Sequence, residues 1–496
     1  GHLYEAAVAH YQATRRRGLL DIALKNADLV CHVFGDGKKN KSDHPEIELA
    51  LVKLYKITGR EKYLNLAKRF CDFNLVGVGL TRRKYAKDAQ EYEAAGHAVA
   101  STYAYCGMTD LIALQRAPEY RRLINSLWEG VVSKKLYLNG GIGNFGEYFG
   151  APYVLSNSAL DHKTVDEDPT DSWGAGQPPE IETCAAIAFS LWNHRLFQLY
   201  GDAKYIDVLE RTLYNVFSSS VSLAGDTFFY ANAQLHDGKR FCNAVYKERV
   251  PFFQRGGNCC PTNIVRLFPQ IPSMIYAQKE DNFYVNLFID SDVTLNVKGT
   301  KVGLHQKTNY PWDGHIEIHL EPEKPVEFAL NIRVPGWTRN QPLPSDLYRY
   351  MNNREENVTL DLNAEEIPLQ VDKGFAVIQR QWKKGDIIQI DLPMPVRRVL
   401  CHDAVTANTG KVALERGPIV YCAEGVDNNN KVLDLVLSDN AKLQSEYHSD
   451  LLNGVVIIKA QSKQHDIVAI PYNCWLNRGQ NEMTVWFHRE AIPGKP

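Results

Sequence analysis

The order of apolar and polar residues divides the chain into a helical first half and a strand-rich second half. Up to about residue 278, apolar residues recur at helical spacing. One pattern occurs three times, near Tyr11, Tyr55 and Leu199: an apolar helix, a short polar turn and a second amphipathic helix. Repeated helical hairpins predict an α/α toroid of six hairpins, whose helix starts and loops surround a central cleft. An irregular helical domain has the same periodicity, but the shared turn chemistry favours the toroid.

After Asp281 the period changes to two. Phe283, Val285, Leu287 and Ile289 alternate with polar neighbours, and turn signals separate later runs of the same kind. Those runs cover residues 316–320, 328–334 and 388–392. This alternation predicts antiparallel β-sandwich domains.

The expected fold is therefore α+β and multidomain. An (α/α)6 toroid is expected over residues 1–278, a β-sandwich over 279–400, and a second sandwich or a continuation over 401–496. The last boundary follows a weaker break in the pattern near residues 398–408.

Composition narrows the classes of partner. Among 496 residues, 56 Lys and Arg balance 58 Asp and Glu, and the absence of a long basic run argues against nucleic acid. No apolar run approaches the length of a membrane span. The first residues, Gly1-His2-Leu3, already follow a helical pattern without a Met start or signal peptide. An upstream portion is therefore expected to be missing, and the residues assign neither a compartment nor an oligomeric state.

Three of the ten cysteines have unusual neighbours. Most cysteines stand alone in apolar runs, where a thiol is a small inert side chain. Cys259 and Cys260, in contrast, are adjacent between a Gly-Gly pair and Pro261, which predicts an exposed turn. A disulfide between neighbours strains the peptide, whereas two adjacent thiolates can reach one cation.

A second candidate metal-binding motif is Glu182-Thr183-Cys184. Glu182 and Cys184 would not share a face of a regular helix, but they can converge at the start of the helix expected over residues 185–199. Together with Cys259 and Cys260 they offer three thiolates and one carboxylate, a plausible tetrahedral zinc site. The alternatives are inert buried cysteines, a purely structural zinc, and a redox pair formed by Cys259 and Cys260.

These motifs resemble those of glycoside hydrolase family 127, the β-L-arabinofuranosidases, and of the related family 146. The resemblance covers essentially the whole chain and includes the strings Gly146-Glu147-Tyr148, Tyr230-Ala231-Asn232 and Asn477-Arg478-Gly479. It implies that Glu182, Cys184, Cys259 and Cys260 bind zinc, that Cys259 is the nucleophile, and that Glu147 is the acid/base. The implied reaction is the retaining release of terminal L-arabinofuranose from the non-reducing end of a plant glycan or glycopeptide.

Three histidines open helical segments, where a toroid would place them at the cleft. The resemblance implies that His2, His44 and His97 hold the sugar together with Glu210 and Tyr230. The alternative for each histidine is a helix cap or a core residue. Glycan-degrading relatives favour the bacterial periplasm over the cytoplasm.

The chain departs from the family pattern in one region. Tyr153-Val154-Leu155-Ser156-Asn157 lacks the proline that relatives usually have, and an acidic loop over residues 161–180 follows it. The loop is expected to reshape the subsites and to disfavour an acidic substrate. Two rival functions remain: the same machinery acting on another pentose or deoxy sugar of plant pectin, and a non-catalytic, zinc-stabilised carbohydrate-binding protein.

Overall fold

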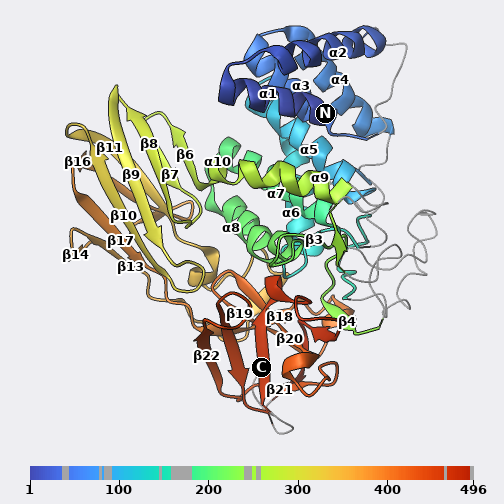
Figure 1. The fold of residues 1–496 in the computed structure, drawn as a ribbon, viewed down its shortest axis with the longest axis vertical. Coiled ribbons are helices and arrows are strands. Elements are labelled where there is room, and N and C mark those ends of the chain that lie inside the picture. The colour runs from blue at the N-terminus through green and yellow to red at the C-terminus, as the bar shows by residue number, and fades with distance from the viewer. Residues whose placement is uncertain are drawn as a thin grey trace.

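A computed structural model describes most of the chain as one helical part and two β-rich parts (Figure 1). The described residues are 1–35, 44–77, 81–82, 92–144, 148–157, 181–239, 249–252, 259–462 and 466–491. Within them, no helix combines the length and the apolar character that crossing a membrane requires. The cysteines they contain are free.

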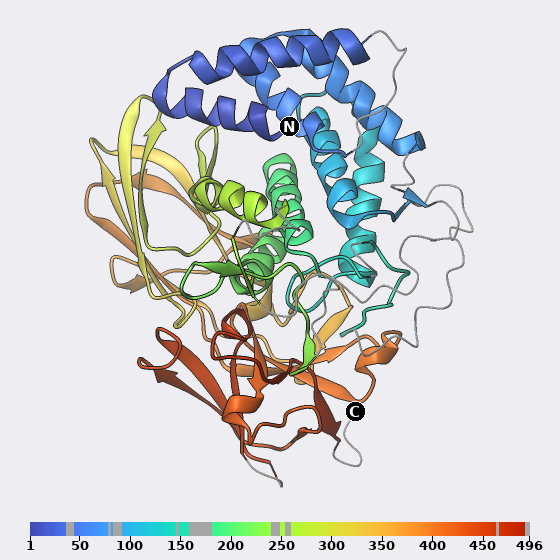
Figure 2. The same ribbon diagram turned by 45° about the vertical axis from the view of Figure 1, so that its right-hand side comes forward.

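The helical part is built from consecutive hairpins. Among the described residues these are α1 (His2–Thr14) with α2 (Gly18–Phe34), α3 (Ile47–Thr58) with α4 (Glu61–Gly77), α5 (Ala98–Ala113) with α6 (Tyr120–Lys134), and α7 (Thr183–Tyr200) with α8 (Ala203–Thr212). Helices α9 (Cys259–Leu267) and α10 (Pro272–Ile275) follow. The first helices of the hairpins pack against one another, from α1 through α3, α5 and α7 to α9. Figure 2 shows this succession turning until the green α7–α9 segment lies near the N-terminus. The toroidal arrangement expected from the repeats is confirmed.

The turns that follow α1, α3 and α7 share one backbone conformation. Helices α1, α3 and α7 each end in a left-handed residue, at Arg15, Gly59 and Gly201, with φ of 60°, 67° and 63°. A left-handed residue at this point closes a helix because its N–H bonds back to a carbonyl of the last turn. The three sequence repeats therefore coincide with three hairpins of the same construction.

The middle of the chain forms two antiparallel-rich sheets. One sheet has the order β14-β13-β17-β10-β9-β8 and the other β15-β16-β11-β7-β6, with β7 and β11 parallel. Their bounds are β6 Tyr276–Lys279, β7 Asn282–Val285, β8 Ser291–Val297, β9 Thr300–Thr308, β10 His315–Pro322, β11 Val326–Arg333, β13 Thr359–Leu362, β14 Glu365–Glu366, β15 Val371–Asp372, β16 Phe375–Trp382 and β17 Asp386–Asp391. The predicted alternation is confirmed on β10, where Ile316, Ile318 and Leu320 are fully buried. The run expected to reach Ile289 ends as a strand at Val285.

In the described part of the chain, the third part is an eleven-stranded sheet with the central order β12-β18-β19-β20-β24-β23-β22. It contains β18 Val396–Cys401, β19 Lys411–Arg416, β20 Ile419–Glu424, β21 Val436–Ser438, β22 Leu443–His448, β23 Val455–Ala460, β24 Ile467–Pro471, β25 Glu482–Thr484 and β26 Phe487–Glu490. Two strands join it from earlier segments: β4 (Leu235–Asp237) pairs with β25, and β12 (Tyr348–Tyr350) pairs with β18. Short ladders pair β1 (Thr81–Arg82) with β2 (Glu93–Ala94) and β3 (Thr227–Phe228) with β5 (Val250–Pro251).

Buried ion pairs connect the helical part to both β-rich parts. Arg333 Nη1 on β11 lies 2.8 Å from Asp207 Oδ1 on α8, and Arg211 Nη1 on α8 lies 2.9 Å from Glu415 Oε2 on β19. Both arginine side chains are almost completely enclosed. The α7–α8 hairpin is thus anchored on two sides, which steadies the ring around it.

Candidate active site and metal centre

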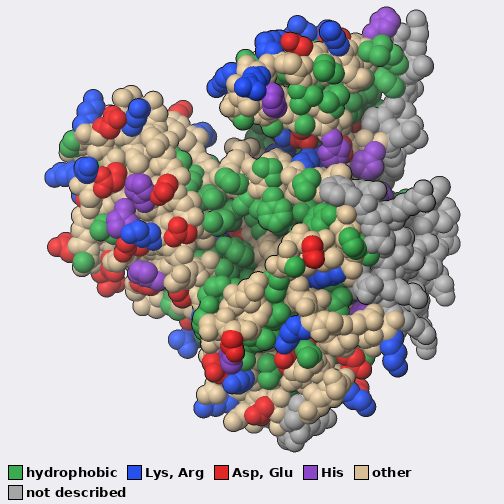
Figure 3. Space-filling view, in the orientation of Figure 1, with side chains coloured by type: hydrophobic (Ala, Val, Ile, Leu, Met, Phe, Trp, Pro, Cys, Tyr) green, Lys and Arg blue, Asp and Glu red, His purple; other side chains and the backbone are tan. Residues whose placement is uncertain are grey.

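The N-terminal ends of the inner helices meet around one cavity. His2 is the first residue of α1, His97 caps α5, Glu182 caps α7 and Cys259 begins α9. The cavity has a volume of about 340 Å³ and is lined by His2, His44, Glu46, His97, Val99, Tyr103, Glu182, Cys184, Tyr230, Cys259, Thr262 and Asn263. In the space-filling view, histidine side chains gather beneath the upper helical lobe, where the surface is hollowed (Figure 3). The structure therefore brings most of the residues expected at the cleft into one site.

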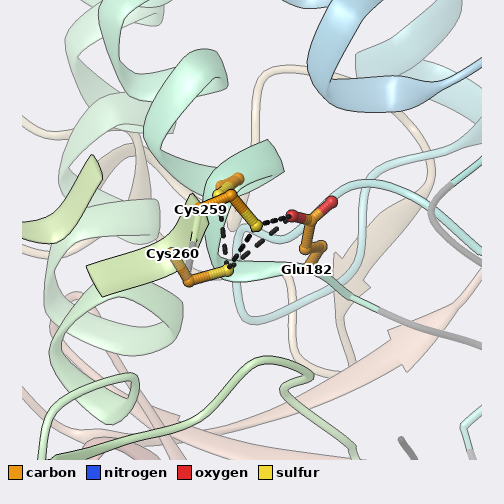
Figure 4. A group of neighbouring side chains, drawn as sticks. Glu182, Cys259 and Cys260 are labelled. Atoms are coloured by element: carbon orange, nitrogen blue, oxygen red, sulfur yellow. Dashed lines mark hydrogen bonds between the residues drawn. The ribbon is translucent and has the colours of Figure 1, made fainter. Parts of the chain in front are cut away.

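Glu182, Cys184, Cys259 and Cys260 form a compact cluster beside this cavity. Figure 4 shows Glu182, Cys259 and Cys260 pointing toward one another. Their ligand atoms all lie within 4.8 Å of one another. Cys260 Sγ is 3.3 Å from Cys184 Sγ and 4.0 Å from Cys259 Sγ, and Glu182 Oε1 is 3.7 Å from the sulfurs of both Cys259 and Cys260.

These separations suit a single tetrahedral ion. Zinc–sulfur bonds of about 2.3 Å at tetrahedral angles place sulfurs about 3.8 Å apart, and a zinc-bound oxygen about 3.5 Å from each sulfur. Three of the four distances lie within about 0.2 Å of these values, and the Cys184–Cys260 separation of 3.3 Å is shorter than the ideal one. This group of one carboxylate and three thiols, of which Cys259 is the exposed member, can hold a metal ion.

Backbone geometry explains how Glu182 and Cys184 converge. Glu182 is extended, with ψ of 137°, and the helix begins directly after it at Thr183. Thr183 N donates to Tyr230 O at 2.9 Å, so this segment is pinned to the one that carries Tyr230. The change from extended to helical backbone turns both side chains toward the same point, as the sequence suggested.

The adjacent cysteines lie in a different local structure from the one expected. They are the first two residues of helix α9, not an isolated turn. Pro261 is compatible with this position because the N–H groups of a first helical turn have no partner within the helix. Cys259 is exposed, whereas Cys260 is completely buried, and both are free thiols.

The three thiols differ in acidity. The pKa of Cys259 is lowered because the Cys184 and Cys260 thiols donate hydrogen bonds to its sulfur. Burial, and then its hydrogen bonds with Cys184 and Cys259, raise the pKa of Cys260, and burial likewise raises that of Cys184. Negative charge in the cluster therefore concentrates on Cys259, and the positive end of the α9 dipole supports it there.

Aromatic and imidazole groups surround the exposed sulfur. The Tyr230 hydroxyl lies 3.9 Å from Cys259 Sγ. The His44 and His97 rings meet edge to face with centroids 5.8 Å apart, and His97 Nδ1 accepts a hydrogen bond from Ala100 N at 3.2 Å. Burial, and then the nearby His97, lower the pKa of His44. A neutral imidazole here can both donate to and accept from hydroxyl groups.

Glu210 is not brought to this cavity. Its side chain is buried on α8, where it accepts a hydrogen bond from Tyr310 Oη at 2.7 Å and forms an ion pair with Arg333. The cavity is built from the starts of inner helices, whereas α8 is the outer helix of its hairpin. Its contacts are those of a link between the helical part and the β-sandwich.

Glu147 and the acidic loop over residues 161–180 lie outside the described residues. In the segment before Glu147, the backbone at Gly140 lies close to helix α8. Gly140 has φ of +85°, and a Cβ there would lie 2.7 Å from Thr212 Cα. On the other side of Glu147, Tyr148 pairs with His97 across an isolated bridge, and their ring centroids are 5.5 Å apart.

Sequence reasoning missed several residues at the site. Glu46 accepts from His2 at the cavity edge, with Nε2 and Oε1 3.1 Å apart. Asn263 and Tyr103 line the cavity from α9 and α5. Asn263 follows Cys259 by four residues, so a helix starting at Cys259 would have placed both on one face. Tyr103 has no comparable signal in the sequence.

Family models match almost the entire chain. The model of the β-L-arabinofuranosidase GH127 catalytic domain matches residues 1–273, the GH127 middle domain residues 282–394, and the family 127 C-terminal domain residues 396–488. The chain belongs to glycoside hydrolase family 127. Membership makes it a glycoside hydrolase, which acts on a carbohydrate.

Relatives in family 127 resemble the chain over nearly its full length. A non-reducing end β-L-arabinofuranosidase of Bifidobacterium longum subsp. longum is 29% identical over 555 residues, covering 99% of this chain and 78% of the relative. A solved family 127 β-arabinofuranosidase is 39% identical, with a TM-score of 0.86, covering 99% of this chain and 77% of that one. A family 127 β-L-arabinofuranosidase from Geobacillus stearothermophilus T6 is 34% identical, with a TM-score of 0.83, covering 99% and 79%.

Proposed function

We propose that the chain is a retaining exo-glycosidase that releases terminal L-arabinofuranose from β-L-arabinofuranosides of plant glycans or glycopeptides. The observation that carries this proposal is the cluster of Glu182, Cys184, Cys259 and Cys260, whose exposed member lines a histidine-rich cavity. A cavity of about 340 Å³ suits one small sugar, since drug-sized ligands occupy pockets of roughly 300–1,000 Å³. Family 127 relatives that carry this activity in their names support the choice of sugar.

We infer that the ion held by the cluster is Zn²⁺. Three thiolates and a carboxylate are a donor set that zinc accepts readily, and the cluster's separations suit its bond lengths. When bound, zinc supplies a sulfur that is ionised at neutral pH and that leaves a carbon atom more easily than an uncoordinated thiolate does.

The chain's own residues divide the remaining work. Cys259 Sγ attacks the anomeric carbon while the glycosidic bond breaks and Glu147 protonates the leaving oxygen. Water then attacks the same carbon, gives a proton to Glu147 and displaces the Cys259 thiolate. Tyr148 supports this role for Glu147, because it joins that segment to the cavity residue His97. His2, His44, His97 and Tyr230 bind hydroxyl groups of the sugar.

The test is hydrolysis of p-nitrophenyl β-L-arabinofuranoside by the reduced protein, with zinc measured by elemental analysis. We expect one zinc per chain and release of the sugar with retained configuration, followed by NMR. Cys259→Ser should lower turnover by roughly 10³-fold or more, as loss of a covalent nucleophile does. Cys31→Ser, at a half-buried thiol on α2, is the matched control and should leave turnover unchanged.

Each alternative has its own signature. Turnover of a different pentoside or deoxy sugar, with none of the arabinofuranoside, would contradict the proposed substrate. Sugar binding by both the wild type and Cys259→Ser without turnover would identify a carbohydrate-binding protein. A reduced protein without zinc, in which Cys259 and Cys260 oxidise to a disulfide, would identify the redox pair.

A further inference from the structure

The most enclosed part of the cluster has a hydrogen-bond donor outside the four ligands. Asn263 Nδ2 on α9 donates to Cys184 Sγ at 3.2 Å. Both side chains are buried, with exposed fractions of 4% and 1%. A donor at this distance contacts a sulfur that an ion in the cluster would also contact, so it acts on the ligand itself.

The orientation of the Asn263 amide is fixed by its other contacts. Its Oδ1 accepts from Tyr103 Oη at 2.9 Å and from Arg266 Nη1 at 3.1 Å. A guanidinium only donates hydrogen bonds, so the amide oxygen must face Arg266. The N–H groups of Asn263 are thereby turned toward Cys184, and the opposite orientation would set two donors against each other.

Arg266 connects this contact to the edge of the sugar cavity. It donates to Tyr103 Oη at 2.9 Å and forms ion pairs with Glu5 and Glu46. Glu46 in turn contacts His2 on the cavity wall. A continuous polar network therefore runs from the sugar-facing residues to the sulfur of Cys184.

Charge explains why the cluster needs such a donor. Three thiolates, one carboxylate and one divalent ion carry a net charge of −2, and burial makes that charge costly. An N–H directed at one thiolate stabilises it and lowers its donation to the ion. The ion then draws more charge from its other ligands, Cys259 among them.

We propose that Asn263 is a positioning residue of the metal centre, which orients and stabilises the Cys184 thiolate and is itself held in place by Tyr103 and Arg266. This inference rests on the proposed zinc site. It goes beyond that site because Asn263 is not a ligand and touches no reacting atom.

The test compares zinc affinity, by chelator competition, among the full-length wild type, Asn263→Asp, Asn263→Ala and Tyr103→Phe. Asn263→Asp keeps the shape and the contacts with Arg266 but turns an oxygen toward the sulfur. We expect it and Asn263→Ala to weaken zinc binding by roughly 10–100-fold, the usual effect of removing an outer-shell partner. Tyr103→Phe leaves Arg266 holding the amide and should have a smaller effect in the same direction.

Cobalt spectra separate positioning from general destabilisation. In the Co²⁺-loaded protein, loss of the N–H should shift the sulfur-to-metal charge-transfer band to lower energy, because the thiolate becomes electron-richer. Asn193→Ala is the control, since Asn193 is a buried amide on α7 that bonds Trp128 and Phe189 and no ligand. It should shift neither the band nor the zinc affinity.

Two results would overturn the inference while leaving the zinc site intact. One is unchanged zinc affinity and an unchanged cobalt band in both Asn263 variants. The other is a loss of affinity that Asn193→Ala reproduces without any band shift. A wild-type protein that binds no zinc would overturn the proposed function as well, so the two failures are distinguishable.

Discussion

The thiols of Cys184, Cys259 and Cys260 differ in burial and therefore in chemistry. Cys260 is fully buried and Cys184 nearly so, whereas Cys259, one residue earlier on α9, is exposed beside Tyr230. Successive residues of a helix point about 100° apart, which sends one thiol of the pair inward and the other toward the cavity. The adjacent pair in the sequence predicted a metal site. It did not show which of the two thiols faces the cavity, because that depends on the residue at which the helix starts.

Glu147 is the residue whose role is tested most sharply by chemistry. If it protonates the leaving oxygen, Glu147→Gln should lower kcat/KM by roughly 10²–10⁴-fold for a poor leaving group such as an alkyl alcohol. A dinitrophenyl leaving group needs no protonation, so its kcat/KM should fall far less. Steady-state kinetics across leaving groups of graded pKa measures this, with the exposed Glu129→Gln on α6 as control. An equal loss for every leaving group would contradict the assignment.

At the scale of elements, the site is assembled by one repeated feature. Inner helices α1, α5, α7 and α9 all contribute residues at their first turn or cap. The hairpin repeats predicted that helix starts would surround a cleft, and the structure confirms that arrangement for the histidines and the cluster. The pairing of β4 and β12 with a distant sheet could not be predicted, because a short strand's pattern shows which face is buried but not its partner.

The direction of the Glu210 side chain could not be predicted from the sequence either. A motif resemblance supplies a position along the chain, but the direction of a side chain depends on which helix of the hairpin carries it. Glu210 lies on the outer helix α8 and faces Arg333 of the β-sandwich. Its carboxyl is enclosed, and burial raises its pKa against the opposing effect of Arg333.

The ion pair between Glu210 and Arg333 predicts that loss of Glu210 lowers the stability of the protein and leaves sugar binding unchanged. Glu210→Ala leaves the buried Arg333 guanidinium with fewer partners, and breaking a buried ion pair costs about 3–5 kcal/mol. We expect a lower thermal midpoint with unchanged KM for the arabinofuranoside. The double variant Glu210→Ala, Arg333→Met should recover part of the loss, because no unpaired charge remains. A raised KM at an unchanged midpoint would instead place Glu210 at the sugar.

At the scale of the molecule, the ring and the β-rich parts form one connected structure. Ion pairs from α8 reach both β-rich parts, and β4 extends from the helical half into the third sheet. Changes of periodicity along the chain identified the helical and strand-rich halves because each half repeats one element type over many residues. The contacts between the halves have no such period, since they depend on single residues such as Arg211 and Glu415.

We expect a buried histidine inside the ring to contribute to the loss of stability of the protein at acid pH. His194 on α7 is 9% exposed, and its pKa is lowered from 6.5 to about 4 by burial and by the charges of Arg195 and Lys53, against an opposing effect of Asp110. The unfolded chain therefore binds the extra proton first as pH falls. The contribution of neutral His194 to the free energy of unfolding is therefore complete above pH 6.5, and it is lost progressively toward pH 4.

The expected magnitude follows from that window. A shift from 6.5 to about 4 corresponds to about 3 kcal/mol at 1.36 kcal/mol per pH unit. His194→Gln removes the titrating group while keeping a polar side chain, so its stability should fall less between pH 6.5 and 4 than that of the wild type. Urea unfolding followed by helical circular dichroism at several pH values measures both proteins. The cluster and the surface carboxylates titrate alike in the wild type and in His194→Gln. Their effect therefore cancels when the two free energies of unfolding are subtracted. Parallel pH profiles would show that His194 is protonated as readily in the folded chain as in the unfolded one.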